Sequence, residues 1–156
     1  GLHSNAVPSP IAWKHIVLFT AGYPTKRAVA VEAGSGRVLW EYGKGTAYVP
    51  SPVPWDGHFY LMTDSGMLTC LEAGTGKAVY EGERLPAPAK FTASAVALAG
   101  HILLTADDGR TFVMRAGPKP VPVAVNNLEE PMMASPAIVG NRLYLRGERH
   151  LFCIGQ

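Results

Sequence analysis

Hydrophobic residues along the chain come in short runs that turns separate. Runs rich in β-branched and aromatic residues occupy residues 16–20, 59–63, 102–105 and 143–145, and Gly, Asp or Asn lies close to each run. Short apolar runs bounded by such turn residues are typical of β-strands. The longest stretches without Gly or Pro span only eleven residues, too short for repeated helix pairs. The pattern therefore predicts an all-β chain.

The predicted strands recur in a fixed frame of 41 to 43 residues. Four anchors set the frame: Ser9-Pro10-Ile11, Ser51-Pro52-Val53, Ser94-Ala95-Val96 and Ser135-Pro136-Ala137. A turn, a strand, a second turn and a third strand follow each anchor, and the first three copies add a fourth strand. Repeats of about 42 residues with four strands each are the signature of β-propeller blades. A sandwich or barrel is the alternative.

We therefore predict one propeller segment with three full blades and a three-stranded fourth. The expected blades cover residues 7–42, 49–82, 91–126 and 132–156. Each is an antiparallel four-stranded meander of about 42 residues, except the last.

Two segments carry a more specific pattern. Residues 30–40 read Ala-Val-Glu-Ala-Gly-Ser-Gly-Arg-Val-Leu-Trp, and residues 70–80 read Cys-Leu-Glu-Ala-Gly-Thr-Gly-Lys-Ala-Val-Tyr. Both resemble the tryptophan-docking motif of pyrroloquinoline-quinone-like (PQQ-like) propeller repeats. The positions that match are Ala30, Glu32, Gly36, Trp40, Glu72, Gly76 and Tyr80. The resemblance implies a structural role, in which Trp40 and Tyr80 pack between neighbouring blades; an aromatic ligand platform is the alternative.

Charge and composition narrow the range of partners. Fourteen basic and twelve acidic residues leave a net charge of +2, and 47% of the residues are hydrophobic. The weak charge argues against a nucleic-acid partner, and the apolar share suits a folded core. The longest apolar run is far shorter than a membrane span requires.

Motifs that suggest catalysis are better interpreted as turn and hairpin residues. The segment Gly74-Thr75-Gly76-Lys77 lacks the spacing of a phosphate-binding loop and precedes a strand. His15, His58 and His101 occupy equivalent turns in successive repeats and lack metal-ligand spacing. No catalytic or metal-binding residue is predicted.

The two cysteines occupy equivalent third-strand positions in the second and fourth copies. A whole blade would separate Cys70 from Cys153, whereas a disulfide needs Cα atoms within about 7 Å. Two free, buried thiols are expected.

These observations favour a non-catalytic scaffold or binding module without a cofactor. Its recognition face is expected where the connections between blades meet the turns between second and third strands. The candidate binding residues there are Tyr48, Asp64, Lys90, Asp107, Asp108 and Arg149. Ordinary solvated turn residues are the alternative reading of this set.

The alternative function is a fragment of a PQQ- and calcium-dependent quinoprotein dehydrogenase, with PQQ and calcium as its cofactors. Such relatives have adjacent cysteines and a cluster of acid and amide ligands. This chain has no adjacent cysteines, and its one Asn-Asn pair, Asn126-Asn127, falls in a connection between blades.

The fourth copy stops after its third strand, and the strand that would complete it projects before residue 1. We therefore expect half of an eight-bladed ring, the blade number usual in the family. Its partner is a second copy of the chain or a missing upstream part. The resemblance also implies an extracytoplasmic location, periplasmic or secreted.

Overall fold

The computed structural model describes residues 5–155, which form four antiparallel sheets and no helix. The first sheet contains β1 (Ile11–Trp13), β2 (Ile16–Ala21), β3 (Arg27–Glu32) and β4 (Val38–Tyr42). The second contains β5 (Val53–Trp55), β6 (His58–Met62), β7 (Met67–Glu72) and β8 (Ala78–Arg84). The third contains β9 (Val96–Leu98), β10 (His101–Thr105), β11 (Arg110–Arg115) and β12 (Val121–Asn127), and the fourth contains β13 (Ala137–Val139), β14 (Arg142–Arg146) and β15 (Leu151–Ile154).

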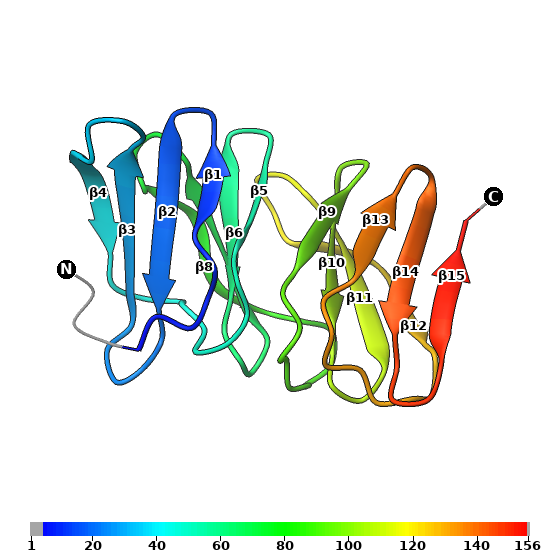
Figure 1. Ribbon diagram of the computed structural model, residues 1–156. Coiled ribbons are helices and arrows are strands. Elements are labelled where there is room, and N and C mark those ends of the chain that lie inside the picture. The colour runs from blue at the N-terminus through cyan, green and yellow to red at the C-terminus, as the bar shows by residue number, and fades with distance from the viewer. Residues whose placement is uncertain (1–4, 156) are drawn as a thin grey trace.

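Each sheet is a meander in which consecutive strands pair. The four sheets follow one another across Figure 1 in chain order, from blue to red. The predicted fold class, with three four-stranded sheets and one three-stranded sheet, is confirmed. No helix that could cross a membrane occurs among residues 5–155.

The register is the same from sheet to sheet. The residue nine positions after each anchor serine pairs with an equivalent residue of the third strand: Leu18 with Ala30, Tyr60 with Cys70, Leu103 with Val113, and Tyr144 with Cys153. In the three complete sheets the same third-strand residue pairs outward with Trp40, Tyr80 or Ala124. These three residues therefore occupy one structural position.

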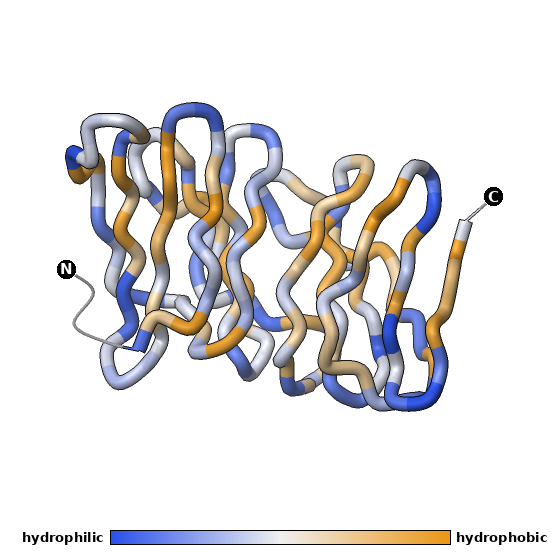
Figure 2. The backbone as a smooth tube through the Cα atoms, viewed as in Figure 1, coloured by the Kyte–Doolittle hydropathy of each residue, from blue (hydrophilic) through white to orange (hydrophobic). Residues whose placement is uncertain are grey.

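Apolar side chains are buried between neighbouring sheets. Figure 2 shows hydrophobic residues along the strands and many hydrophilic residues at the turns. Between the first and second sheets, Trp40 is 8% exposed and packs with Leu18 and Phe59. Its Nε1 donates a 2.8 Å hydrogen bond to the carbonyl of Ala73.

The second-sheet hairpin fits this indole closely. A Cβ atom on Gly76 would lie 2.5 Å from the Trp40 ring, so a side chain there would displace the ring. Gly76 also has a φ of 69°, a conformation that glycine adopts without strain.

Tyr80 lies at the same position between the second and third sheets. It packs against a buried cluster that includes Cys70, Ile102 and Phe112. Its buried hydroxyl has no hydrogen-bond partner among the described residues. The phenol fills the interface, but it does not reproduce the bond that the indole makes.

The anchor serines link adjacent sheets through a repeated hydrogen bond. The amide of Ser9 donates to Oγ of Ser51, the amide of Ser51 to Oγ of Ser94, and the amide of Ser94 to Oγ of Ser135, each at 2.9 Å. The two serines of each bond are 41 to 43 residues apart in the sequence, which is one repeat. The repeat period thus has a direct structural cause, because Ser51 and Ser94 each donate to the next copy and accept from the previous one.

Both cysteines are free, but only Cys70 is buried. Burial raises the pKa of the Cys70 thiol to about 11. The expectation that Cys153 is buried as well is wrong. Cys70 is buried against residues of the third sheet, whereas no described sheet packs on the equivalent face of the fourth, so Cys153 is exposed.

Candidate functional site

One edge of the molecule gathers the connections between sheets and the turns between second and third strands (Figure 1). We call this edge the linker rim. Its connections are residues 43–52, 85–95 and 128–136, and its turns are residues 22–26, 63–66, 106–109 and 147–150.

Two aspartates attach connections to the turn of the sheet that follows. Asp64 accepts hydrogen bonds from the amides of Tyr48 at 2.9 Å and Val49 at 3.2 Å. Asp107 accepts from the amide of Thr92 at 2.7 Å and from its hydroxyl at 3.2 Å. Bonds to a carboxylate are stronger than bonds between neutral groups. Both side chains therefore fix the shape of the rim.

In the fourth sheet the connection supplies the carboxylate and the turn supplies the amides, the reverse of the second and third sheets. Its turn lacks an aspartate, and the carboxylate comes from Glu130 in the connection, which is 3% exposed. Glu130 accepts hydrogen bonds from the amide of Arg149, the amide of His150 at 2.9 Å and Nδ1 of His150 at 2.8 Å. Burial alone would raise the pKa of Glu130, but these hydrogen bonds outweigh it and lower the pKa to about 2.

Two adjoining pockets lie in the linker rim around the second and third sheets. One, of about 640 Å³, is lined by Ser65, Pro88, Ala89, Lys90, Asp107 and Asp108. The other, of about 400 Å³, is lined by Lys26, Val49, Thr63, Asp64, Ser65, Lys90, Phe91, Thr92 and Asp107. Ser65, Lys90 and Asp107 belong to both, so the pockets form one contiguous concave surface.

The pockets bring together four of the six predicted binding residues, Asp64, Lys90, Asp107 and Asp108. Tyr48 lines neither pocket. Its ring meets Tyr23 edge-on at 6.0 Å, and both rings are exposed. Arg149 also lines neither pocket, and its amide donates to Glu130.

Asp108 pairs with Arg110 at 2.6 Å. The neighbouring guanidinium lowers the pKa of Asp108 below its ordinary value. Arg110 also donates to the carbonyl of Pro88 at 2.9 Å. The arginine, which is the first residue of β11, therefore links the third sheet to the connection that lines the larger pocket.

The cationic side chains of the smaller pocket are Lys26 and Lys90. Neither forms an ion pair with a carboxylate among residues 5–155. Because Asp64 and Asp107 already accept hydrogen bonds from the connections, the two ammonium groups are the polar groups free to meet a ligand.

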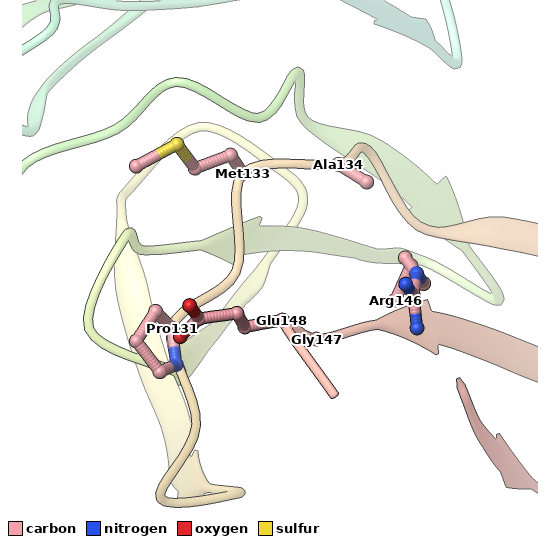
Figure 3. Close-up of a pocket in the computed structure, with 6 residues that line it drawn as sticks. All are labelled: Pro131, Met133, Ala134, Arg146, Gly147 and Glu148. Atoms are coloured by element: carbon pink, nitrogen blue, oxygen red, sulfur yellow. The ribbon is translucent and has the colours of Figure 1, made fainter. Parts of the chain in front are cut away.

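A third pocket, of about 460 Å³, lies on the linker rim of the fourth sheet (Figure 3). Pro131, Met133, Ala134, Arg146, Gly147 and Glu148 line it. Met133 is 65% exposed. The lining of this pocket thus includes an exposed apolar side chain and an arginine.

Sequence reasoning missed Lys26, Glu130 and Arg146. A signal for Glu130 was present, because the turn at residues 147–150 lacks the aspartate found in the second and third copies. A carboxylate from outside the turn was then needed to hold the connection. No comparable signal marked Lys26 or Arg146.

Among the described residues, no three His, Cys, Asp or Glu side chains converge on a point where a metal ion would bind. His58 and His101 instead place Nδ1 within 2.8 Å and 2.9 Å of the carbonyls of Asp56 and Ala99 in their own turns. These rings are held by local turn geometry.

No family model and no curated protein matches the chain. Solved structures do. BamB from Moraxella catarrhalis superposes with a TM-score of 0.79 at 15% identity, over 98% of this chain and 45% of that one. A europium-containing methanol dehydrogenase superposes with a TM-score of 0.61 at 14% identity, over 76% of this chain and 24% of that one. The chain has the fold of a PQQ-like β-propeller.

The four sheets are therefore propeller blades. The chain spans less than half the length of the BamB structure. It also superposes on the computationally designed Ika4 protein with a TM-score of 0.78 at 14% identity, over 99% of this chain and 93% of that one. At these identities the likeness concerns the fold.

Proposed function

We propose that this propeller is a non-catalytic scaffold that binds an extended, acidic segment of a partner protein on its linker rim. The observation that carries the proposal is the contiguous concave surface formed by the two adjoining pockets, with Lys26 and Lys90 among its lining residues. Connections and turns that a rigid scaffold holds in place are common sites of recognition.

The state of the rim carboxylates supports binding over catalysis. A general base needs a carboxylate that is free to reach a substrate proton. Asp64 and Asp107 accept hydrogen bonds from the connections, and Asp108 is paired with Arg110. Each is engaged in holding the rim.

The described residues do not fit the cofactor set of a quinoprotein dehydrogenase. That site needs several oxygen ligands for calcium around the quinone, and no convergent set of three acidic, His or Cys side chains occurs among residues 5–155. Cys70 and Cys153 lie in different blades. We therefore propose a function without PQQ or calcium. Retention of quinone absorbance by the protein through gel filtration with PQQ and calcium would contradict this.

We also propose that a second copy of the chain completes an eight-bladed ring. The serine ladder supports this, because the Ser135 amide has no following anchor serine among the described residues, and the Ser9 hydroxyl has no preceding one. One copy's Ser135 would donate to the other's Ser9, as Ser94 does to Ser135 at 2.9 Å. Light scattering is expected to give the mass of a dimer, and a monodisperse monomer would contradict the pairing.

The exposed surface of the fourth blade is consistent with such a neighbour. Val139 and Leu151 are 64% and 63% exposed, and a following blade would cover apolar side chains of this kind. Closed two-fold assemblies are the commonest oligomers. From its resemblance to PQQ-like propellers, we propose that the protein acts outside the cytoplasm.

The binding proposal is tested by selection from a displayed library of unstructured peptides on the wild-type protein. Acidic sequences with apolar residues should be enriched. Lys90→Glu should abolish the enrichment, because it reverses a charge shared by both pockets.

Lys77→Glu is the matched control, because it makes the same charge change on the β7–β8 hairpin at the opposite edge. It should leave the selection unchanged. Equal enrichment on the wild type and Lys90→Glu would place binding elsewhere.

A further inference from the structure

The third blade has alanine where the first two have an aromatic residue. Ala124 pairs with Val113 just as Trp40 pairs with Ala30 and Tyr80 with Cys70. A register shift follows the pair in all three blades. The side chain that fills the first two interfaces is therefore truncated to a methyl group at the third.

A cavity of about 440 Å³ lies at this third interface. Its walls are Leu103, Thr111, Val113, Asn126, Asn127 and Leu128 of the third blade and its connection, with Leu143, Leu145 and Ile154 of the fourth. Most of these side chains are apolar. The hydroxyl of Thr111 lies 3.2 Å from that of Thr105, so it is satisfied within the protein.

The cavity is the counterpart of the core that surrounds Trp40. By register, Leu143, Leu145 and Ile154 occupy the positions of Phe59, Leu61 and Leu71, which form the second-blade side of that core. Leu103, Thr111 and Val113 likewise occupy the positions of Leu18, Ala28 and Ala30 on the first-blade side. Equivalent positions surround an indole at one interface and line an open space at the other.

The fourth-blade residues that line this space all lie on β14 and β15. In the core around Trp40, the second blade contributes residues from β6, β7 and the hairpin that follows, and none from β8. The residues of β6 and β7 have their counterparts in the fourth blade on β14 and β15.

We infer that the cavity between the third and fourth blades binds a free planar aromatic molecule of about the size of indole. Ligand pockets typically measure about 300 to 1,000 Å³ and are mostly apolar. An apolar cavity of about 150 Å³ in another protein already admits benzene. At the equivalent interface this fold accommodates an indole and bonds its N–H. Asn126 and Asn127 supply polar groups for such a ligand.

The test measures indole binding by calorimetry and by the shift in melting temperature. The wild type should bind indole saturably and melt at a higher temperature in its presence. Ala124→Trp should place an indole ring at the register position of Trp40 and weaken the binding of free indole by about tenfold or more. Val125→Trp is the matched control, because Val125 is 45% exposed, pairs in regular register with Phe112, and adjacent residues of a regular strand point to opposite faces. It should bind indole as the wild type does.

A second measurement needs no variant. Nuclear Overhauser effects between indole protons and the methyl groups of Leu143, Leu145 and Ile154 are expected in the wild type. Their absence at saturation, or equal indole binding by wild type and Ala124→Trp, would overturn the inference. Binding of a tryptophan-bearing peptide without binding of free indole would also overturn it, since the occupant would then be a protein segment.

Discussion

The interface between the first and second blades is filled by Trp40, whereas the interface between the third and fourth has Ala124 at the same register position. Both interfaces keep the serine hydrogen bond at 2.9 Å. A carboxylate also attaches the connection at each, through Asp64 in one and Glu130 in the other. The comparison teaches that hydrogen bonds along the linker rim set the blade spacing, while the aromatic residue supplies packing that one interface does without.

The largest effect is expected from Trp40→Ala. Truncation of a buried aromatic side chain destabilises by about 3–5 kcal/mol, and here it also leaves the Ala73 carbonyl without its donor. Urea denaturation measures the free energy of unfolding. Val38→Ala, at a 52% exposed position on the same strand, should change it by less than about 0.5 kcal/mol. A loss below about 1 kcal/mol for Trp40→Ala would mean that the indole is dispensable at the first interface also.

Asp64→Ala should have the next largest effect. It removes the acceptor of the Tyr48 and Val49 amides, and hydrogen bonds to charged groups contribute about 1.5–3 kcal/mol. Asp108→Ala is the matched control, because its ion pair is exposed and such pairs contribute about 0–1 kcal/mol. Equal losses in urea denaturation would show that Asp64 has no special role in holding the connection.

Glu130 should make the fourth blade sensitive to acid. Its pKa falls from an ordinary value of 4.5 to about 2 in the folded protein, so the folded state favours the charged form. The resulting stabilisation is complete above about pH 4.5 and is lost as the pH falls through about 2. The urea midpoint of the wild type should fall across this window. Glu130→Gln should be less stable at neutral pH and should lose this part of the pH dependence; an unchanged slope would contradict the assignment.

Much of the fold was predictable from the sequence. The anchor serines, the strands and the aromatic motif positions repeat in register, so each local pattern indicated the same sheet. The partners of Asp64 and Asp107 were not predictable, because a turn aspartate bonds either within its turn or to a distant connection, and only the folded chain distinguishes them. The exposure of Cys153 was missed because its strand position matches that of buried Cys70. The cavity between the third and fourth blades was missed because the third copy lacks a recognisable motif.

The smallest effect is expected from Tyr80→Phe, at the intermediate interface. It removes a buried hydroxyl that has no partner among the described residues, and an unpaired buried polar group destabilises by about 1–3 kcal/mol. Phenylalanine keeps the ring, so stability should be unchanged or rise by up to about 1 kcal/mol in urea denaturation. A clear loss of stability would show that the Tyr80 hydroxyl forms a hydrogen bond, contrary to the difference from Trp40 described above.

The central claim is that the linker rim of this propeller binds an acidic segment, and fluorescence anisotropy with a selected acidic peptide tests it most directly. The account predicts saturable binding by the wild type and by Lys77→Glu with equal dissociation constants, and a loss of about tenfold or more in affinity for Lys90→Glu. Equal affinity of all three proteins, or a loss confined to Lys77→Glu, would contradict it.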